Sequence, residues 1–177
     1  MHYGAFLRAI NVGKHNRVKM DDLRAVCSSL GFSNVSTYLQ TGNVAFEAAD
    51  SEEAAASRLE EALLAIGLRN VAVVVRTPAA LLELLDGEPF AKHDSALFTQ
   101  LVTFFRGALP PGTELVLSAG SFAVVEVRRQ EVLTAAGLGQ SGAFDLNGYL
   151  ERKFKVQATT RNWNVVQEFV ARMCPAS

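Results

Sequence analysis

The hydrophobic pattern of the chain alternates between the period of a strand and the period of a helix. Residues 3–10 form a short apolar run that ends at a turn signal, which predicts a buried strand. Apolar residues then recur three and four positions apart, the spacing of one helix face. A tight hairpin over residues 35–47, a second helix and a strand over 71–76 complete the order βαββαβ. We expect the following helix positions to be buried: Leu23, Val26, Leu30, Leu59, Leu63 and Ile66.

Capping residues indicate where the helices begin and end. Asp50 and Glu53 have the spacing of a capping box before the second helix, and Gly67 follows its last apolar position. Pro78, directly after Thr77, predicts the start of a further helix. These signals separate the predicted helices from the strands on either side.

The second half of the chain shows roughly the same order of elements without a visible sequence repeat. A strand over 99–105 precedes a hairpin over 121–135, and helices over 145–154 and 162–173 follow. Residues 109–120 are ambiguous, because a Pro-Pro-Gly turn is followed by a stretch that fits either a short helix or a strand.

This element order predicts an α+β fold of two tandem ferredoxin-like α/β plaits with an additional C-terminal helix. We expect the first βαββαβ plait at residues 1–77 and a helical linker at 78–94. The second plait-like domain, with the C-terminal helix, is expected at residues 95–177. A chain of 177 residues is long enough for two small domains.

The composition is that of an ordinary soluble globular protein. Apolar residues make up 49% and charged residues 20%, which argues against disorder. No apolar run approaches the roughly 20 residues that span a bilayer, and we recognise no signal peptide. We therefore expect a cytoplasmic protein without a membrane partner. The two cysteines and three histidines show no metal-ligand spacing, so neither a metal site nor a cofactor is predicted.

The net charge is −1, but the charge is unevenly distributed. Residues 1–24 hold five Lys and Arg against two Asp, and residues 151–177 hold five against two Glu. The middle of the chain is acidic. Such a distribution favours a localised anion-binding site over a protein coated with positive charge.

The first candidate site follows the first predicted strand. That strand contains Arg8 and breaks at Asn11, and a polar loop with Lys14, Asn16 and Arg17 then leads to a helix. A cationic loop after a strand is a common way to present donors to a ligand. Each asparagine, taken alone, is better explained by the turn conformations that Asn tolerates.

Arg8 allows two interpretations. It is either a structural cation paired within the fold, as buried arginines usually are, or a donor on an open face of the first sheet. In the second case Gln40 and Asn43 would lie beside it on neighbouring strands.

The second candidate site is the segment Arg161-Asn162-Trp163-Asn164. Helix capping explains Asn162, and core packing explains Trp163. Neither explains Arg161, in a segment that is already basic. An arginine and an indole beside a helix N-terminus could hold an anion or stack a planar group, so both interpretations stay open.

Three stretches together resemble the family named domain of unknown function 1697: LRAINVGKHNRVKM at residues 7–20, TYLQTGNVAF at 37–46 and ATTRNWNVV at 158–166. Their order and spacing match over nearly the whole chain, and TTRNWN is the most specific string. The resemblance implies a fold of two α/β plaits and a set of motif positions, but no activity. Departures from the family pattern are Ala9 and Lys14, where glycine is frequent, and Lys19, where proline is common.

Residues 137–142 fit the pattern G-x-G-x-x-G, but they do not predict a dinucleotide site. The preceding strand belongs to a hairpin, and residues 155–164 contain no acidic residue for a ribose. In the resembling family a lysine usually follows this glycine loop. Gly142 stands at that position here, which argues against an anion-binding role for the loop. Nucleophile-elbow, zincin, P-loop and RNP1 patterns are also missing from the sequence.

Three hypotheses follow. The first is a binding module for a phosphate-bearing ligand, a nucleotide or a nucleic acid, in a basic cleft between the plaits. The second is an enzyme acting on a small anionic metabolite, with Arg8 and Arg161 orienting the substrate. The third is a non-catalytic interaction protein whose motif residues are structural. The predicted ligand-binding residues are Arg8, Asn11, Lys14, Asn16, Arg17, Gln40, Asn43, Arg161, Asn162, Trp163 and Asn164.

Overall fold

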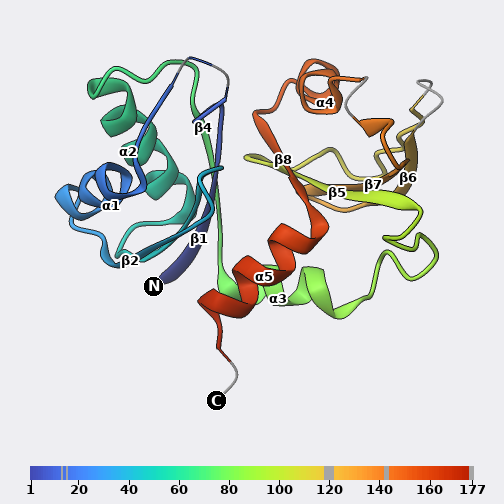
Figure 1. Cartoon of the computed structure of the whole chain (residues 1–177), viewed down its shortest axis with the longest axis horizontal. Coiled ribbons are helices and arrows are strands. Elements are labelled where there is room, and N and C mark those ends of the chain that lie inside the picture. The colour runs from blue at the N-terminus through green and yellow to red at the C-terminus, as the bar shows by residue number, and fades with distance from the viewer. Residues whose placement is uncertain (13, 15, 118–121, 142–143, 176–177) are drawn as a thin grey trace. The chain divides into compact units, whose positions relative to one another are not determined.

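The computed structural model describes residues 1–12, 14, 16–117, 122–141 and 144–175, so Gly142 and the start of the predicted hairpin at residue 121 lie outside the described residues. The chain divides into two compact units, Met1–Leu82 with Phe169–Ser177, and Glu83–Glu168. Each unit contains a four-stranded antiparallel sheet (Figure 1). This confirms the predicted α+β fold of two ferredoxin-like plaits with an additional C-terminal helix. No helix in the described parts of the chain is long and apolar enough to cross a bilayer.

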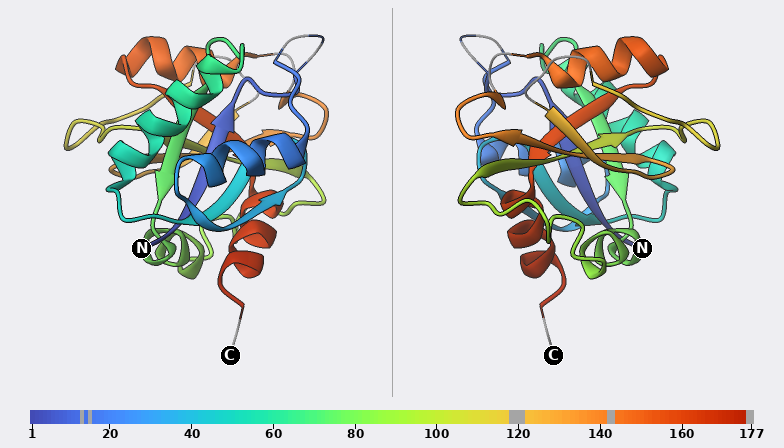
Figure 2. Two further views of the ribbon diagram at one scale, coloured as in Figure 1. Left: turned by 90° about the vertical axis from the view of Figure 1, so that its left-hand side faces the viewer. Right: turned by 90° about the vertical axis from the view of Figure 1, so that its right-hand side faces the viewer.

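The first unit follows the predicted order βαββαβ. Its elements are β1 (His2–Arg8), α1 (Met20–Ser29), β2 (Ser33–Tyr38), β3 (Asn43–Glu47), α2 (Glu52–Ala65) and β4 (Ala72–Arg76). Helix α3 (Pro78–Asp86) then starts at the predicted proline. The strand order in the sheet is β2-β3-β1-β4, and α1 and α2 lie over one face of it (Figure 2, left).

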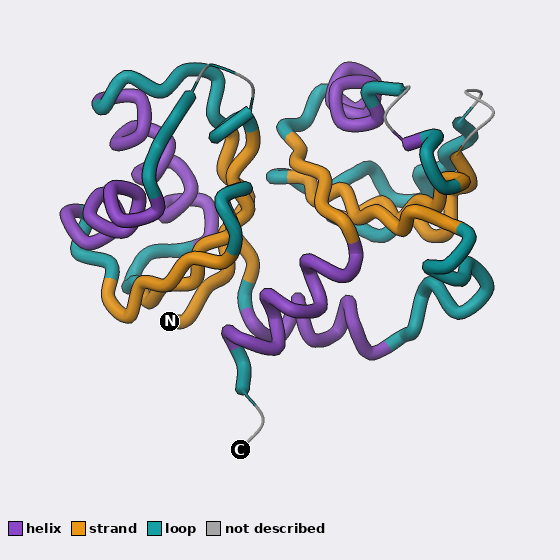
Figure 3. The backbone as a smooth tube through the Cα atoms, viewed as in Figure 1, coloured by secondary structure: helices purple, strands orange, loops and turns teal. Residues whose placement is uncertain are grey.

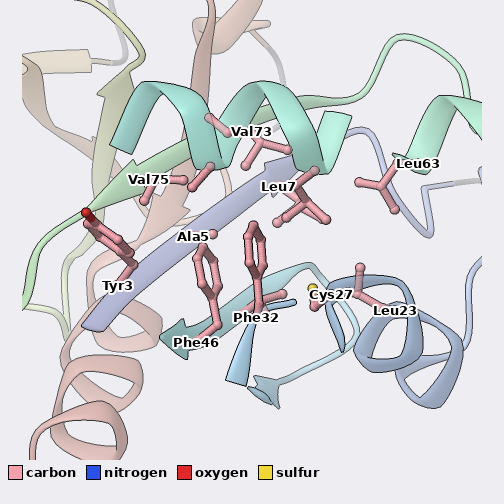
Figure 4. Packing of buried hydrophobic residues seen from close by; sticks show 14 of the residues in the cluster. Tyr3, Ala5, Leu7, Leu23, Cys27, Phe32, Phe46, Leu63, Val73 and Val75 are labelled. Carbon is pink, nitrogen blue, oxygen red and sulfur yellow. The ribbon is translucent and has the colours of Figure 1, made fainter. Parts of the chain in front are cut away.

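The core of the first unit lies between this sheet face and the two helices. Alternate residues of β1, namely Tyr3, Ala5 and Leu7, point into it (Figure 4). The rings of Phe32 and Phe46 stack there with centroids 4.4 Å apart. Of the six helix positions predicted to be buried, Leu23, Leu59 and Leu63 are fully buried, and Val26 and Leu30 pack against the cluster as partly buried residues.

The prediction was wrong for Ile66, which is 52% exposed. Helix α2 ends at Ala65, and Gly67 adopts a left-handed φ of 97° that turns the chain. The N–H of Leu68 then donates to the carbonyl of Leu63 (3.1 Å), which returns Leu68 to the core at 5% exposure. This Schellman arrangement places the residue after the glycine inside and leaves the residue before it in solvent.

The start of α2 also differs from the predicted capping box. The N-cap is Ser51, whose Oγ accepts a hydrogen bond from the backbone N–H of Ala54 (3.2 Å). Asp50 instead forms an ion pair with Arg58. The helix therefore begins one residue later than the predicted capping box implies, with Ser51 in place of Asp50 as the N-cap.

The face of β1 that points away from α1 and α2 is covered by other residues, although we expected it to be open. A Cβ on Gly4 would lie 3.0 Å from Phe169 and 3.1 Å from Met173, both near the end of α5 (Trp163–Met173). The rings of Phe6 and Phe169 meet edge to face with centroids 5.4 Å apart. Arg8 follows at the same alternation, but it is the last residue of β1 rather than a mid-strand residue.

The second unit repeats the plait with one helix missing. Its elements are β5 (Phe98–Phe105), β6 (Phe122–Val127), β7 (Glu131–Gly137), α4 (Leu146–Phe154) and β8 (Ala158–Asn162), with sheet order β6-β7-β5-β8. The described residues between β5 and β6, 106–117, form a loop where the first unit has α1 (Figure 3). Three leucines of this loop pack in the core of the unit beside α4: Leu109, Leu115 and Leu117.

Both plaits protect the edge strand that ends the sheet in the same way. A carboxylate oxygen of Glu60, on α2, accepts a hydrogen bond from the backbone N–H of Val73 in β4 (2.7 Å). A carboxylate oxygen of Glu151, on α4, accepts one from the N–H of Ala158 in β8 (2.7 Å). The helix before each edge strand thus covers a backbone donor that would otherwise be open to strand pairing.

Candidate functional site

The loop between β1 and α1 contains several left-handed residues among those that the structure describes, 9–12, 14 and 16–19. Ala9, Asn11 and Asn16 adopt left-handed φ angles of 62°, 53° and 51°. Leu39, in the turn between β2 and β3, has a φ of 57°. This conformation costs about 1 kcal/mol or more for Ala9 and Leu39, whereas asparagine adopts it readily, so the surrounding contacts must hold Ala9 and Leu39 in place.

Asn11 supplies part of that hold. Its Oδ1 accepts a hydrogen bond from the N–H of Val18 (2.9 Å), and its Nδ2 donates to the carbonyl of the same residue (3.0 Å). Nδ2 also donates to the carbonyl of Gln40 (2.9 Å). The side-chain amide therefore ties both ends of the loop together and fastens them to the β2–β3 turn.

Asn16 makes the corresponding set of bonds toward the other edge of the sheet. Its Oδ1 accepts from the N–H of Arg69 (2.9 Å), and its Nδ2 donates to the carbonyl of Arg69 (2.6 Å) and to that of Ala9 (2.7 Å). An asparagine amide has two donor hydrogens, and both are used here within the protein. The geometry thus assigns Asn11 and Asn16 to loop positioning.

The same loop carries three exposed cations: Lys14, Arg17 and Lys19. None of them forms an ion pair with any residue that the structure describes. Other arginines of the described residues do pair with acids, among them Arg24 with Asp21, Arg58 with Asp50, Arg128 with Glu126 and Arg152 with Asp145. The loop is therefore a local concentration of uncompensated positive charge in a chain whose net charge is negative.

Two further predicted residues lie in the β2–β3 turn region. Asn43 is completely buried, and its Nδ2 donates to the carbonyl of Tyr38 (2.9 Å) and to Oγ1 of Thr41 (3.2 Å). Gln40 is exposed, and its backbone carbonyl accepts the bond from Asn11. The first unit thus brings the turn and the loop together.

Arg161 lies in β8 of the second unit, where it pairs with Val102 across the sheet. Its Nη1 donates to Oγ1 of Thr159 (2.8 Å) and to the carbonyl of Thr160 (2.9 Å). Burial of the guanidinium lowers the pKa of Arg161 to about 10, so the side chain is still charged at neutral pH. A partly desolvated guanidinium held in one orientation interacts strongly with an anion.

The three residues after Arg161 differ in exposure. Asn162 and Asn164 are exposed at the N-terminus of α5, and Oδ1 of Asn164 accepts a hydrogen bond from the N–H of Val165 (2.9 Å). Trp163 is only 6% exposed and packs against Phe90 with ring centroids 5.2 Å apart. The burial agrees with the core-packing interpretation of Trp163, and the side chain of Asn164 bonds to the backbone of the residue that follows it.

Two observations bear on the chemistry of the titratable side chains in the described residues. Burial raises the pKa of the Cys27 thiol to about 12, so the thiol is not a nucleophile near neutral pH. No group of three or more His, Cys, Asp or Glu side chains in the described parts of the chain could hold a metal ion.

Sequence reasoning did not single out Arg69. No spacing rule links it to the loop, because Asn16 and Arg69 are 53 positions apart. The only local signal is a basic residue just before the fourth strand, next to Asn70 in a left-handed conformation. Long-range contacts of this kind become visible only when the strands are paired.

Comparison with known proteins shows what the chain is similar to. The sequence profile of the family described as "Protein of unknown function (DUF1697)" matches residues 1–131, which include the first two of the three motifs. No curated protein matches the sequence. A solved structure titled as the conserved bacterial protein SP0830 from Streptococcus pneumoniae is similar in fold, with a TM-score of 0.67 and 19% identity. The alignment covers 98% of each chain.

Proposed function

The chain belongs to the DUF1697 family of proteins of unknown function, and we propose that it binds a phosphate-bearing ligand, a nucleotide or a nucleic acid, through loop 9–19. One observation carries the proposal: Lys14, Arg17 and Lys19 are exposed on this loop without an acidic partner among the described residues. Three like charges on one short loop repel each other, and a bound anion relieves that repulsion. Lys and Arg side chains of this kind neutralise the phosphate groups of nucleic acids.

The bracing of the loop supports the same function. Ala9, Asn11 and Asn16 have left-handed φ angles. Five hydrogen bonds between the side-chain amides of the two asparagines and the backbone of Ala9, Val18 and Arg69 hold this part of the loop in place. A further bond joins Asn11 to Gln40. A loop held in one conformation loses little conformational entropy when it binds a ligand. Strained, over-determined backbone is found preferentially at ligand-binding sites.

Arg161, Asn162 and Asn164 are included in the proposal as a second anion-binding position, in the second unit. The guanidinium of Arg161 is oriented by Thr159 and Thr160, and the two exposed asparagines flank the N-terminus of α5. The positive end of a helix dipole and a desolvated guanidinium both favour an anion there. The packing of Trp163 against Phe90 gives that residue a supporting role.

Fluorescence anisotropy with a labelled oligothymidylate of about ten nucleotides tests the proposal, with ADP as competitor. The triple variant K14A/R17A/K19A should weaken binding at least about tenfold at about 50 mM salt. A matched control, K92A/R129A/K153A, removes the same charge from three exposed cations that also lack an acidic partner among the described residues. The control should stay near the parent affinity.

Two results would overturn the proposal. One is a parent protein that binds neither the oligonucleotide nor ADP at low salt. The other is a control variant that loses as much affinity as the loop variant, because binding would then depend on overall charge rather than on the loop. Thermal melting of all three proteins shows whether the loop variant is still folded.

A further inference from the structure

We propose that Arg69 is a fourth cation of the loop site and that the site takes a ligand with two or more linked phosphates. This inference rests on the proposed function of loop 9–19 and extends it to a residue far away in the sequence. It also restricts the class of ligand from any phosphate ester to molecules with several linked phosphates. Such molecules are polyphosphates, nucleoside polyphosphates and nucleic-acid strands.

The hydrogen bonds of Asn16 place Arg69 beside the loop. Oδ1 and Nδ2 of Asn16 bond to the N–H and the carbonyl of Arg69 at 2.9 and 2.6 Å, so the side chain of Asn16 lies against the backbone of Arg69. Asn16 lies between Lys14 and Arg17 in the sequence. Arg69 is therefore held beside the part of the loop that carries these two cations.

The side chain of Arg69 is exposed and only partly used. Its Nη1 donates to the carbonyls of Leu64 (3.2 Å) and Leu68 (3.3 Å) at the end of α2. These bonds orient the guanidinium, and neither Nε nor Nη2 has a hydrogen-bond partner among the described residues. Two adjacent N–H groups on one edge of a guanidinium match the two oxygens of a phosphate group.

The charge of the enlarged site sets the size of the ligand. Lys14, Arg17, Lys19 and Arg69 together carry four positive charges, and none has an acidic partner among the described residues. Of the two acidic residues in the first turn of α1, Asp21 is already paired with Arg24, so it offsets little of this charge. A phosphate monoester carries at most about two negative charges, which leaves much of the site uncompensated. Linked phosphates supply the remainder and reach several cations at once.

Competition experiments test the ligand class. Inorganic phosphate, pyrophosphate and tripolyphosphate are titrated against the labelled oligothymidylate bound to the parent protein. Tripolyphosphate should compete at a concentration at least about tenfold lower than inorganic phosphate. Equal competition by all three would overturn the inference about linked phosphates. If unlabelled oligonucleotides displace the labelled oligothymidylate but tripolyphosphate does not, the linked phosphates that bind here are those of a nucleic-acid strand.

Variants of Arg69 test its place in the site. R69A and R69Q should each weaken binding of tripolyphosphate about tenfold. The affinity of R69K should lie between that of these variants and that of the parent, because lysine keeps the charge but lacks the planar set of donors of a guanidinium. R69Q can still donate to the carbonyls at the end of α2, so it controls for lost helix capping. R129A, an exposed arginine of the second unit, is the matched control and should bind like the parent.

The two proposals fail in different ways. If the parent binds and depends on Lys14, Arg17 and Lys19 but all Arg69 variants keep the parent affinity, this inference is wrong and the proposed function stands. If the parent does not bind at all, the proposed function fails first. The salt dependence of oligonucleotide binding adds a readout that lost stability would not change, since its slope should fall by about 0.7 when the charge of Arg69 is removed.

Discussion

The side-chain amide of Asn16 and the backbone of Arg69 form a closed pair of hydrogen bonds, 2.9 and 2.6 Å long, across 53 positions of the sequence. The pair imitates the bonding of two neighbouring strands, with a side chain in place of one backbone. It connects the loop after β1 to the segment before β4, the strand that pairs with β1. The loop is therefore anchored both to β1, which it follows, and to the segment that leads into β4.

Replacing Asn16 should destabilise the first unit in two separable ways. N16A removes three hydrogen bonds and places a Cβ without a side-chain amide at a φ of 51°, so we expect a loss of about 2–3 kcal/mol. N16G loses the same bonds but tolerates the backbone, so it should be about 1 kcal/mol more stable than N16A. Urea unfolding measures both. Equal stability of N16A and the parent would mean that these bonds contribute nothing.

The core beneath α2 gives a prediction with an internal control. Leu63 is fully buried, and the next residue, Leu64, is 54% exposed. L63A should cost about 2–5 kcal/mol through lost burial and a cavity. L64A should stay within about 0.5 kcal/mol of the parent. Similar losses for the two variants would show that the helix faces are assigned wrongly.

Stability should fall in alkaline solution because of Cys27. Its pKa rises from the ordinary 9.0 to about 12 by burial, so the unfolded thiol ionises at a pH where the folded one is still protonated. The contribution of the protonated Cys27 thiol to the free energy of unfolding is therefore fully present below pH 9 and is lost as the pH rises toward 12. Unfolding free energies at several pH values should therefore decline less steeply for C27A than for the parent. Burial also raises the pKa of Tyr3 and Cys174, so part of the decline should remain.

Gly4 should tolerate no large side chain. A Cβ at this position lies 3.0 Å from Leu81 and Phe169 and 3.1 Å from Met173, closer than packed carbon atoms normally approach. G4A requires small shifts, whereas G4V adds two methyl groups to a filled space. We expect G4V to cost about 1–3 kcal/mol and more than G4A, measured by thermal or urea unfolding. If G4V is as stable as the parent, α5 does not pack on β1 as described.

Most of the fold could be predicted because local signals and tertiary structure agree. The apolar run of β1, the periodic leucines of α2 and the proline at the start of α3 each point to the element that forms. Residues 109–117 were not predictable. Leu109, Leu115 and Leu117 are spaced by six and two positions, which is neither a helix nor a strand period along the whole segment. Their burial comes from the shape of the second core, which no local rule contains.

The sequence drew attention to the loop but could not give the roles of its residues. The motif lies around Asn11 and Asn16, yet the sequence could not show that their amides bond to the backbone of Val18 and Arg69. Burial of Asn43 was equally hidden, and burial of Trp163 was one of two open interpretations. Polar side chains in a motif look alike in a sequence, whether they face a ligand or replace a missing backbone bond.

The grouping of Phe169–Ser177 with the first unit has a consequence for the order of folding during synthesis. Phe169 and Met173 cover the outer face of β1, although β1 is synthesised before the second plait and these residues after it. While the ribosome is still synthesising the second plait, Gly4 and Phe6 lack the residues of α5 that later pack against them. Nascent first plait should thus remain open to proteases or chaperones on one face until α5 has emerged. Domains that fold as units usually avoid such a delay.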